Sequence, residues 1–151
     1  IESGNKLPPF SLQNQAGETR TGESYAGKWL VLYVYPKDDT PGCTIQGKSF
    51  TATKADFDAA NAVVVGLSAD DVDSHKAFCD KFSFTIELLA DPAQTLLGAL
   101  GVGQSEYKGT KYWDRTTFLV DPTGLIRKIY TKVDPNGHER LILDELATLG
   151  G

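Results

Sequence analysis

The chain of 151 residues contains no methionine, only two cysteines and only two histidines. Two cysteines are too few for a disulfide framework, and they form no Cys-x-x-Cys pair, so we expect a cytoplasmic setting in which any disulfide is transient. The sequence also lacks an apolar run near the roughly 18 residues of a membrane span. Because the net charge is −5 and no basic block is present, neither nucleic acid nor an anionic membrane is an expected partner. The chain starts at Ile1, which leaves a cleaved leader compatible with the sequence.

The pattern of apolar residues predicts one domain over residues 1–151, large enough to bury a core of its own. Trp29–Tyr35 is a continuous apolar run, which is typical of a central strand buried on both faces. The segment Asp121-Pro122-Thr123-Gly124 favours a type I turn between two further strands. Strands are predicted at residues 10–13, 18–21, 29–35, 63–68, 88–89, 117–120 and 125–130, and helices at 41–61, 72–82, 93–100 and 137–149. This order predicts an α/β, thioredoxin-like fold, a mixed central β-sheet with helices on both faces.

Cys43 follows the buried strand in the segment Pro36-Lys37-Asp38-Asp39-Thr40-Pro41-Gly42-Cys43-Thr44. Pro41 disfavours helical geometry at Thr40 and suits the first helical position, so we expect Thr40 as the N-cap and Cys43 as the third helical residue. The Thr40 hydroxyl would then reach the backbone N–H or the sulfur of Cys43. Unpaired N–H groups and the positive dipole end of a helix favour a thiolate over a thiol. The loop is therefore expected to present an activated sulfur nucleophile.

The spacing Pro36-x-x-x-Thr40-x-x-Cys43 resembles the peroxiredoxin signature, and Thr40–Thr44 with Gln46 is similar to the bacterioferritin-comigratory (PrxQ) branch. The resemblance continues through Trp29–Tyr35, Leu88–Pro92 and Arg115–Asp121. It implies a peroxidase that reduces hydrogen peroxide and organic hydroperoxides, with Cys43 as the peroxidatic cysteine that becomes a sulfenic acid. It further implies that Thr40 and Arg115 assist Cys43, that Pro36 shields the pocket, and that no metal or other cofactor is needed.

The chemistry of these residue types agrees with that role. Arg115, the Thr40 hydroxyl and the N–H of Cys43 are candidate donors that stabilise negative charge as it moves from sulfur to the leaving oxygen. Each residue also has a plain structural alternative. Cys43 would be a small buried hydrophobe, Arg115 a solvated surface cation, Thr40 a helix cap alone and Pro36 the end of a strand.

Cys79, in the predicted helix 72–82, is the candidate resolving cysteine. Many members of the branch carry that cysteine five residues after the peroxidatic one, where this chain has Lys48, whereas others place it on the next helix. The resemblance therefore implies a transient Cys43–Cys79 disulfide that thioredoxin or a similar dithiol protein reduces. A disulfide needs Cα atoms about 4.4–6.8 Å apart, so we expect the first turn around Cys43 to unwind and helix 72–82 to move. The alternative is a one-cysteine enzyme in which Cys79 is only a core residue.

Other constellations are weaker. His75 and Cys79 share a helix face at a metal-ligand spacing, but two ligands do not make a zinc site. No protease signature supports a pairing of Cys43 with His75 or His138. Two other functions stay open: a thiol–disulfide oxidoreductase, which the absent Cys-x-x-Cys argues against, and a redox-sensing or chaperone-like binding module. A monomer is expected.

Overall fold

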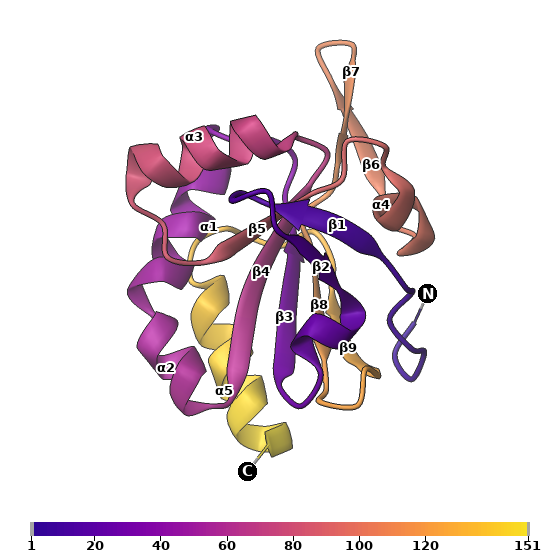
Figure 1. Ribbon diagram of the computed structural model, residues 1–151, viewed down its shortest axis with the longest axis vertical. Coiled ribbons are helices and arrows are strands. Elements are labelled where there is room, and N and C mark those ends of the chain that lie inside the picture. The colour runs from indigo at the N-terminus through magenta and orange to yellow at the C-terminus, as the bar shows by residue number, and fades with distance from the viewer. Residues whose placement is uncertain (1, 151) are drawn as a thin grey trace.

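A computed structural model describes residues 2–150, and within them the main sheet is a mixed one of seven strands (Figure 1). The order across the sheet is β2-β1-β5-β4-β3-β8-β9. The three central strands β5, β4 and β3 are parallel, and every other neighbour is antiparallel. The strands span β1 (Ser11–Asn14), β2 (Thr19–Thr21), β3 (Trp29–Val34), β4 (Ala62–Ser68), β5 (Glu87–Ala90), β8 (Thr116–Val120) and β9 (Ile126–Tyr130).

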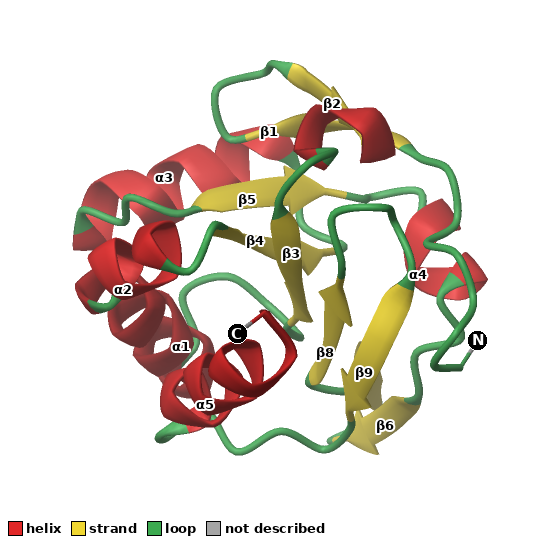
Figure 2. Cartoon of the chain, turned by 90° about the horizontal axis from the view of Figure 1, so that it is seen from below, coloured by secondary structure: helices red, strands yellow, loops and turns green. Residues whose placement is uncertain are grey.

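Helices cover both faces of this sheet. They are η1, a 3₁₀ turn (Gly22–Tyr25), α1 (Pro41–Ala52), α2 (Lys54–Ala59), α3 (Val72–Phe82), α4 (Thr95–Ala99) and α5 (His138–Gly150). One apolar cluster joins the sheet to α1, α2, α3 and α5, and a second joins its other face to η1 and α4. Figure 2 shows α1, α2 and α5 on one side of the sheet and α4 on the other. The predicted thioredoxin-like α/β architecture is confirmed.

The central strand β3 is buried along its whole length, as its composition predicts. Side chains alternate between the two faces of a strand, so Val31 and Tyr33 join the first apolar cluster while Leu32 and Val34 join the second. Tyr33 lies over Gly66 of β4, where a Cβ atom would come within 2.9 Å of the Tyr33 ring. Burial on both faces therefore holds the end of β3, from which the Cys43 loop departs, in a fixed place.

One predicted helix, residues 41–61, is two helices. The chain breaks at Thr53, whose φ of −104° and ψ of 11° leave helical geometry. The Thr53 hydroxyl donates to the carbonyl of Ser49 at 2.8 Å, and such bonds from a threonine back to the preceding turn bend helices. The predicted helix 93–100 is also shorter, because Gln94 adopts a left-handed φ of 60° and α4 begins only at Thr95.

A β-hairpin that the sequence pattern does not predict projects from the molecule, at the top of Figure 1. It consists of β6 (Gln104–Tyr107) and β7 (Thr110–Trp113), which pair only with each other. Lys108 and Gly109 form its tip with φ values of 51° and 80°, the two positive values of a type I′ turn. All of β6 and the start of β7 are exposed, so the apolar alternation that marks a half-buried strand is missing.

Two smaller features complete the frame. The predicted turn between β8 and β9 is present, with the Gly124 N–H donating to the Asp121 carbonyl at 3.0 Å. Within residues 2–150 no helix has both the length and the apolar character needed to cross a membrane.

Candidate active site

Cys43 lies where the sequence places it. Thr40 is extended, with φ −104° and ψ 156°, and Pro41 is the first residue of α1, so Cys43 is the third. Its side chain belongs to the apolar cluster around α1 and is only 1% exposed. The amides of a first helical turn have no partner within the helix and point outward along its axis. Cys43 therefore belongs to the turn whose N–H groups lack helical partners, and its side chain lies in an apolar cluster.

Thr40 occupies the predicted N-cap position, but its side chain does not cap α1. The hydroxyl donates to the carbonyl of Lys37 at 2.9 Å instead. Asp39 adopts a left-handed φ of 58°, which tightens the loop and brings that carbonyl within reach. The expected bond from the Cys43 N–H to the Thr40 hydroxyl oxygen is thus absent. The Thr40 carbonyl does accept from both the backbone N–H and the hydroxyl of Thr44, at 2.9 Å and 2.8 Å.

Arg115 lies against the first turn of α1, although it is 72 positions after Cys43 in the sequence. It connects β7 to β8 and is half-buried. Its guanidinium covers the Cα of Gly42, so that a Cβ at this position would lie 3.1 Å from Arg115 Cζ and closer still to Nη2. Only glycine leaves room for the cation there. The structure therefore places Arg115 against the first turn of α1, and its positive charge lies beside the turn that contains Cys43.

Gln46 is the residue that holds Arg115, a role that its local sequence does not predict. Its Oε1 accepts a hydrogen bond of 2.6 Å from Arg115 Nη1. The side chain is 1% exposed, and its Nε2 group has no hydrogen-bond partner among the described residues. A buried amide is costly to leave half-satisfied. The signal in the sequence was its spacing, because a residue three positions after Cys43 lies on the same face of α1.

Cys79 is on α3 and lies in the same apolar cluster as Cys43, with 7% of its surface exposed. Both thiols are free. Burial, helped by the negative charges of Asp38 and Asp80, raises the pKa of Cys79 to about 12. Burial also raises the pKa of Tyr33 well above 10, and both sulfurs act on it in the same direction. The Tyr33 phenol therefore lies within electrostatic reach of both cysteines, and Cys79 is protonated at neutral pH.

The loop that carries Pro36 and Thr40 is tied to its surroundings through Asp38, which is 6% exposed. Pro36 itself is half-buried, two residues after the end of β3. The Asp38 carboxylate accepts the Tyr35 hydroxyl at 2.5 Å and the Ser74 hydroxyl at 2.8 Å, and it lies 2.7 Å from Nδ1 of His75. These bonds join the loop to β3 on one side and to α3 on the other.

Two of these residues, Asp38 and His75, form with Asp70 a cluster of possible metal ligands. Ligand atoms of Asp38, Asp70 and His75 lie within 4.8 Å of one another. His75 Nδ1 faces Asp38 and Nε2 faces the Leu89 carbonyl at 2.8 Å, so protein partners occupy both ring nitrogens. Asp70 Oδ2 likewise accepts from the Ser68 hydroxyl and the Asp38 amide, at 2.7 Å and 2.9 Å. The cluster is thus a hydrogen-bonded network of the fold, and His75 does not turn a free nitrogen toward Cys79.

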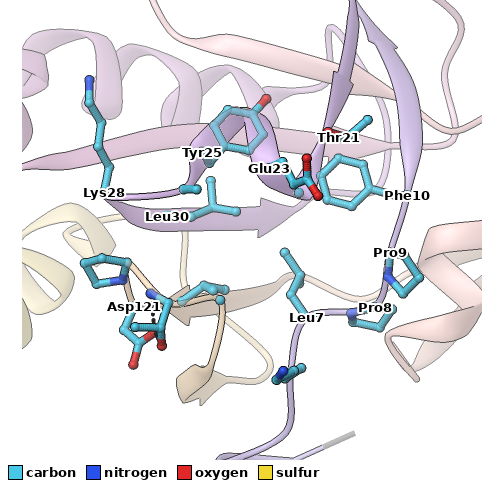
Figure 3. Close-up of a pocket in the computed structure, with 17 residues that line it drawn as sticks. Leu7, Pro8, Pro9, Phe10, Thr21, Glu23, Tyr25, Lys28, Leu30 and Asp121 are labelled. Carbon is cyan, nitrogen blue, oxygen red and sulfur yellow. Dashed lines mark hydrogen bonds between the residues drawn. The ribbon is translucent and has the colours of Figure 1, made fainter.

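A surface groove lies away from Cys43. It has a volume of about 600 Å³ and lies at the opposite end of β3, between the segment Lys6–Phe10, η1 and the β8–β9 turn. Leu7, Phe10 and Leu30 surround its centre (Figure 3). None of the predicted site residues lines it. The candidate site at Cys43 is therefore separate from this groove.

Comparison with known proteins agrees with this geometry. A model described as the AhpC/TSA family matches residues 3–129. The chain belongs to this family of peroxiredoxins. A putative peroxiredoxin Bcp of Coxiella burnetii is 38% identical over 149 residues, which cover 97% of this chain and 99% of the relative. The peroxiredoxin Bcp of Xanthomonas campestris is 39% identical over 141 residues, 91% of this chain and 87% of that protein.

Solved structures give the same placement. A mutant of Xylella fastidiosa PrxQ superposes with a TM-score of 0.94 and 32% identity, covering 100% of this chain and 98% of that one. A mutant of Xanthomonas campestris peroxiredoxin Q superposes with a TM-score of 0.91 and 33% identity over 100% of both chains. The predicted membership in the bacterioferritin-comigratory (PrxQ) branch is confirmed, and this peroxiredoxin is accordingly a thiol-dependent peroxidase.

Proposed function

We propose that Cys43 is the peroxidatic cysteine and that Arg115, Thr40 and Pro36 form its peroxide site. The observation that carries this assignment is the guanidinium of Arg115 seated on Gly42, in the first turn of α1 and one residue before Cys43. Cations and unpaired amides around a sulfur favour the thiolate, which is the nucleophilic form. Pro36 would limit access of water to the sulfur, and the Thr40 hydroxyl would turn from Lys37 to a bound peroxide.

The first step is the attack of the Cys43 thiolate on one peroxide oxygen. The O–O bond breaks, an S–O bond forms, and the second oxygen leaves as hydroxide or alkoxide and takes up a proton. Sulfur is oxidised to the sulfenic acid, and the peroxide is reduced to water or an alcohol. Negative charge moves from sulfur to the leaving oxygen, so donors fixed around that path lower the barrier. In this protein the fixed donors are the Arg115 guanidinium, held by Gln46, and the Cys43 amide.

In the second step, Cys79 would attack the sulfenic sulfur, giving a Cys43–Cys79 disulfide and one molecule of water. Solved structures of Xanthomonas campestris peroxiredoxin Q include cysteine-to-serine mutants at two positions that are 36 residues apart, the separation of Cys43 and Cys79. Because burial raises the pKa of Cys79 to about 12, the closed protein holds it as an unreactive thiol. Resolution would therefore require α3 or the first turn of α1 to open.

The proposed partners follow from the same chemistry. A solved structure of the Xanthomonas campestris protein concerns its alkyl peroxide reduction activity, which supports organic hydroperoxides and hydrogen peroxide as substrates here. A dithiol protein of the thioredoxin type would reduce the disulfide and regenerate both thiols. We further propose a monomer in a reducing compartment such as the cytoplasm, with no nucleic-acid or membrane partner.

The test is the intact mass and free-thiol count of the reduced protein after one equivalent of hydrogen peroxide. Wild type should lose both thiols and about 2 Da, the two hydrogens of disulfide formation, while remaining a monomer. Cys43→Ser should not react, and Cys79→Ser should gain one oxygen. A wild-type protein that gains one oxygen and keeps Cys79 free would refute the resolving role and leave a one-cysteine enzyme.

Assays of protein-disulfide reduction and of sustained peroxide consumption separate the other functional classes. A thiol–disulfide oxidoreductase would reduce protein disulfides while Cys43 stayed inert toward peroxide. A binding module would show no sustained peroxide consumption with thioredoxin and its reductase. Either result would overturn the assignment of Cys43.

A further inference from the structure

The hydrogen bonds from Ser74 and His75 to Asp38, here called the latch, join the two halves of the redox pair. Asp38 lies in the loop that ends at Cys43, and Ser74 and His75 lie on α3, which carries Cys79. We propose that the latch holds these segments in the closed arrangement and so decides when Cys79 reaches the oxidised Cys43. Asp38 and His75 would thus be positioning residues for both steps. This inference rests on the proposed function, and it names the residues that control when the Cys43–Cys79 disulfide forms.

The latch is buried, and the hydrogen-bond partners of His75 restrict where its protons can lie. The side chains of His75 and Asp38 are 0% and 3% exposed. The Leu89 carbonyl can only accept a hydrogen bond, so His75 Nε2 must carry a hydrogen. One further proton is then shared between His75 Nδ1 and Asp38 Oδ2, 2.7 Å apart. Whichever atom carries it, separating the two leaves polar groups without partners in the protein interior, and this opposes opening.

The position of the latch on α3 connects it to Cys79. His75 and Cys79 are four residues apart and lie on the same face of the helix. Unwinding α3 far enough to release Cys79 from the core would also withdraw His75 from Asp38. A second link between the same segments, Lys81 to Asp39 at 2.8 Å, has side chains that are 58% and 48% exposed. Such surface ion pairs contribute little, so of these two links between the loop and α3 the buried latch is the stronger.

Weakening the latch should therefore change the two steps in opposite directions. The disulfide should form faster, because α3 opens more often. Attack on peroxide should slow, because the loop of Thr40 and Cys43 is held less firmly. A purely structural role for His75 would instead lower stability and slow both steps together.

Two substitutions of His75 separate its two hydrogen bonds. His75→Gln places an amide nitrogen where Nε2 was, so it keeps a donor for the Leu89 carbonyl and loses the bond to Asp38. His75→Asn places an amide nitrogen where Nδ1 was, so it keeps a donor for Asp38 and loses the bond to Leu89. Of the two, only the glutamine variant removes the bond between His75 and Asp38, and the Ser74 bond of the latch remains. Lys81→Ala serves as the control for the exposed ion pair.

The first measurement uses no peroxide. In reduced Cys43→Ser protein, the alkylation rate of Cys79 by iodoacetamide reports how often α3 opens, because the closed form buries the thiol. His75→Gln should raise this rate about tenfold, the effect of one lost buried hydrogen bond. Lys81→Ala should stay within about twofold of the parent. His75→Asn keeps the bond to Asp38 but loses the one to Leu89, so it should raise the rate less than His75→Gln does. Equal rates in the glutamine and asparagine variants would overturn the proposal.

The second measurement follows both steps after peroxide addition, in proteins that keep both cysteines. Rapid quenching and intact mass should show slower sulfenic acid formation, faster disulfide formation and less sulfinic acid in His75→Gln than in His75→Asn. Slowing of both steps would refute the latch. Should His75→Gln fail to fold, Ser74→Ala removes the other bond to Asp38 and must give the same changes. If wild type ignores peroxide while His75→Gln still accelerates alkylation, the proposed function fails and the latch stands.

Discussion

At the residue scale, the contact between Gly42 and the Arg115 guanidinium leaves no room for a larger side chain at position 42. A methyl group on Gly42 would displace the end of a flexible arginine rather than backbone, so Gly42→Ala should fold. Exchanging glycine for alanine within a helix even favours it by up to about 1 kcal/mol. The displaced guanidinium would no longer stabilise the charge that develops on the peroxide.

We therefore expect Gly42→Ala to slow oxidation of Cys43 by about tenfold to a hundredfold, measured in a single turnover with hydrogen peroxide. The matched control is Gly98→Ala on α4, where a Cβ would meet nothing within 4 Å. That variant should react like wild type. An unchanged rate in Gly42→Ala would mean that the position of Arg115 does not limit the reaction.

Individual residues also show which parts of the site can be predicted from the sequence. Pro41 and its neighbours determine that Cys43 opens a helix, because the constraint is local. The hydrogen bond predicted for the Thr40 hydroxyl was wrong. The hydroxyl donates instead to the Lys37 carbonyl, which the left-handed turn at Asp39 brings within reach. The bond between Gln46 and Arg115 joins positions 69 apart in the sequence. No local pattern contains such a contact, which arises only when β8 is placed beside β3.

At the element scale, α3 illustrates a helix that the sequence predicts to the residue. It spans Val72–Phe82, and Asp71 at its N-cap accepts a hydrogen bond of 2.8 Å from the Ser74 N–H. The helix ends where Ser83 takes a left-handed φ of 56°. Elements with caps and a buried face are readable, whereas the β6–β7 hairpin is not, because nothing in its exposed strands alternates.

The cap predicts a measurable share of stability. Asp71→Ala leaves the Ser74 amide without its partner and should lower the free energy of unfolding by about 1 kcal/mol. Asp73→Ala, in the same first turn but outside the cap, should cost only about 0.3 kcal/mol, through the helix dipole. Urea unfolding curves of the two variants compare these values. Equal losses would show that charge alone, and not the cap, stabilises the start of α3.

At the scale of the whole molecule, α5 is fixed to the sheet through His138, which is 5% exposed. Its Nε2 lies 2.8 Å from the Thr117 hydroxyl, and its ring meets those of Phe50 and Tyr130 edge-on. Burial lowers the pKa of His138 from 6.5 to about 4. Between these two values the unfolded chain binds a proton at this imidazole and the folded protein does not, so protons favour unfolding.

The contribution of His138 to stability should accordingly be complete above pH 6.5 and be lost as the pH falls to about 4. The loss amounts to about 2–3 kcal/mol. His138→Gln keeps a donor near Thr117 and has no titrating group, so its stability should vary less over this range. Urea unfolding of wild type and His138→Gln at several pH values provides the test. The same change of stability with pH in both proteins would contradict the prediction.

The architecture as a whole was the most predictable level. The order of strands and helices, the central apolar run at Trp29–Tyr35 and the right-handed crossovers of parallel strands leave few alternatives. The sequence does not predict the break at Thr53, because residues 41–61 contain enough helix-forming residues to be predicted as one helix. Such a break changes the direction of a helix but not the topology, so the fold class is insensitive to it.

The projecting hairpin has a practical consequence for anyone who wishes to watch this protein at work. Its base is fastened by the bond of 2.9 Å from Trp113 Nε1 to Gln94, while Lys108 and Gly109 at its tip are exposed. Exposed tips of this kind accept insertions and chemical labels without disturbing the fold. Only Asp114 separates the hairpin from Arg115, so a fluorophore attached at the tip would sit on an arm that starts beside the Cys43 turn. The molecule thus carries its own attachment point for an optical reporter of turnover.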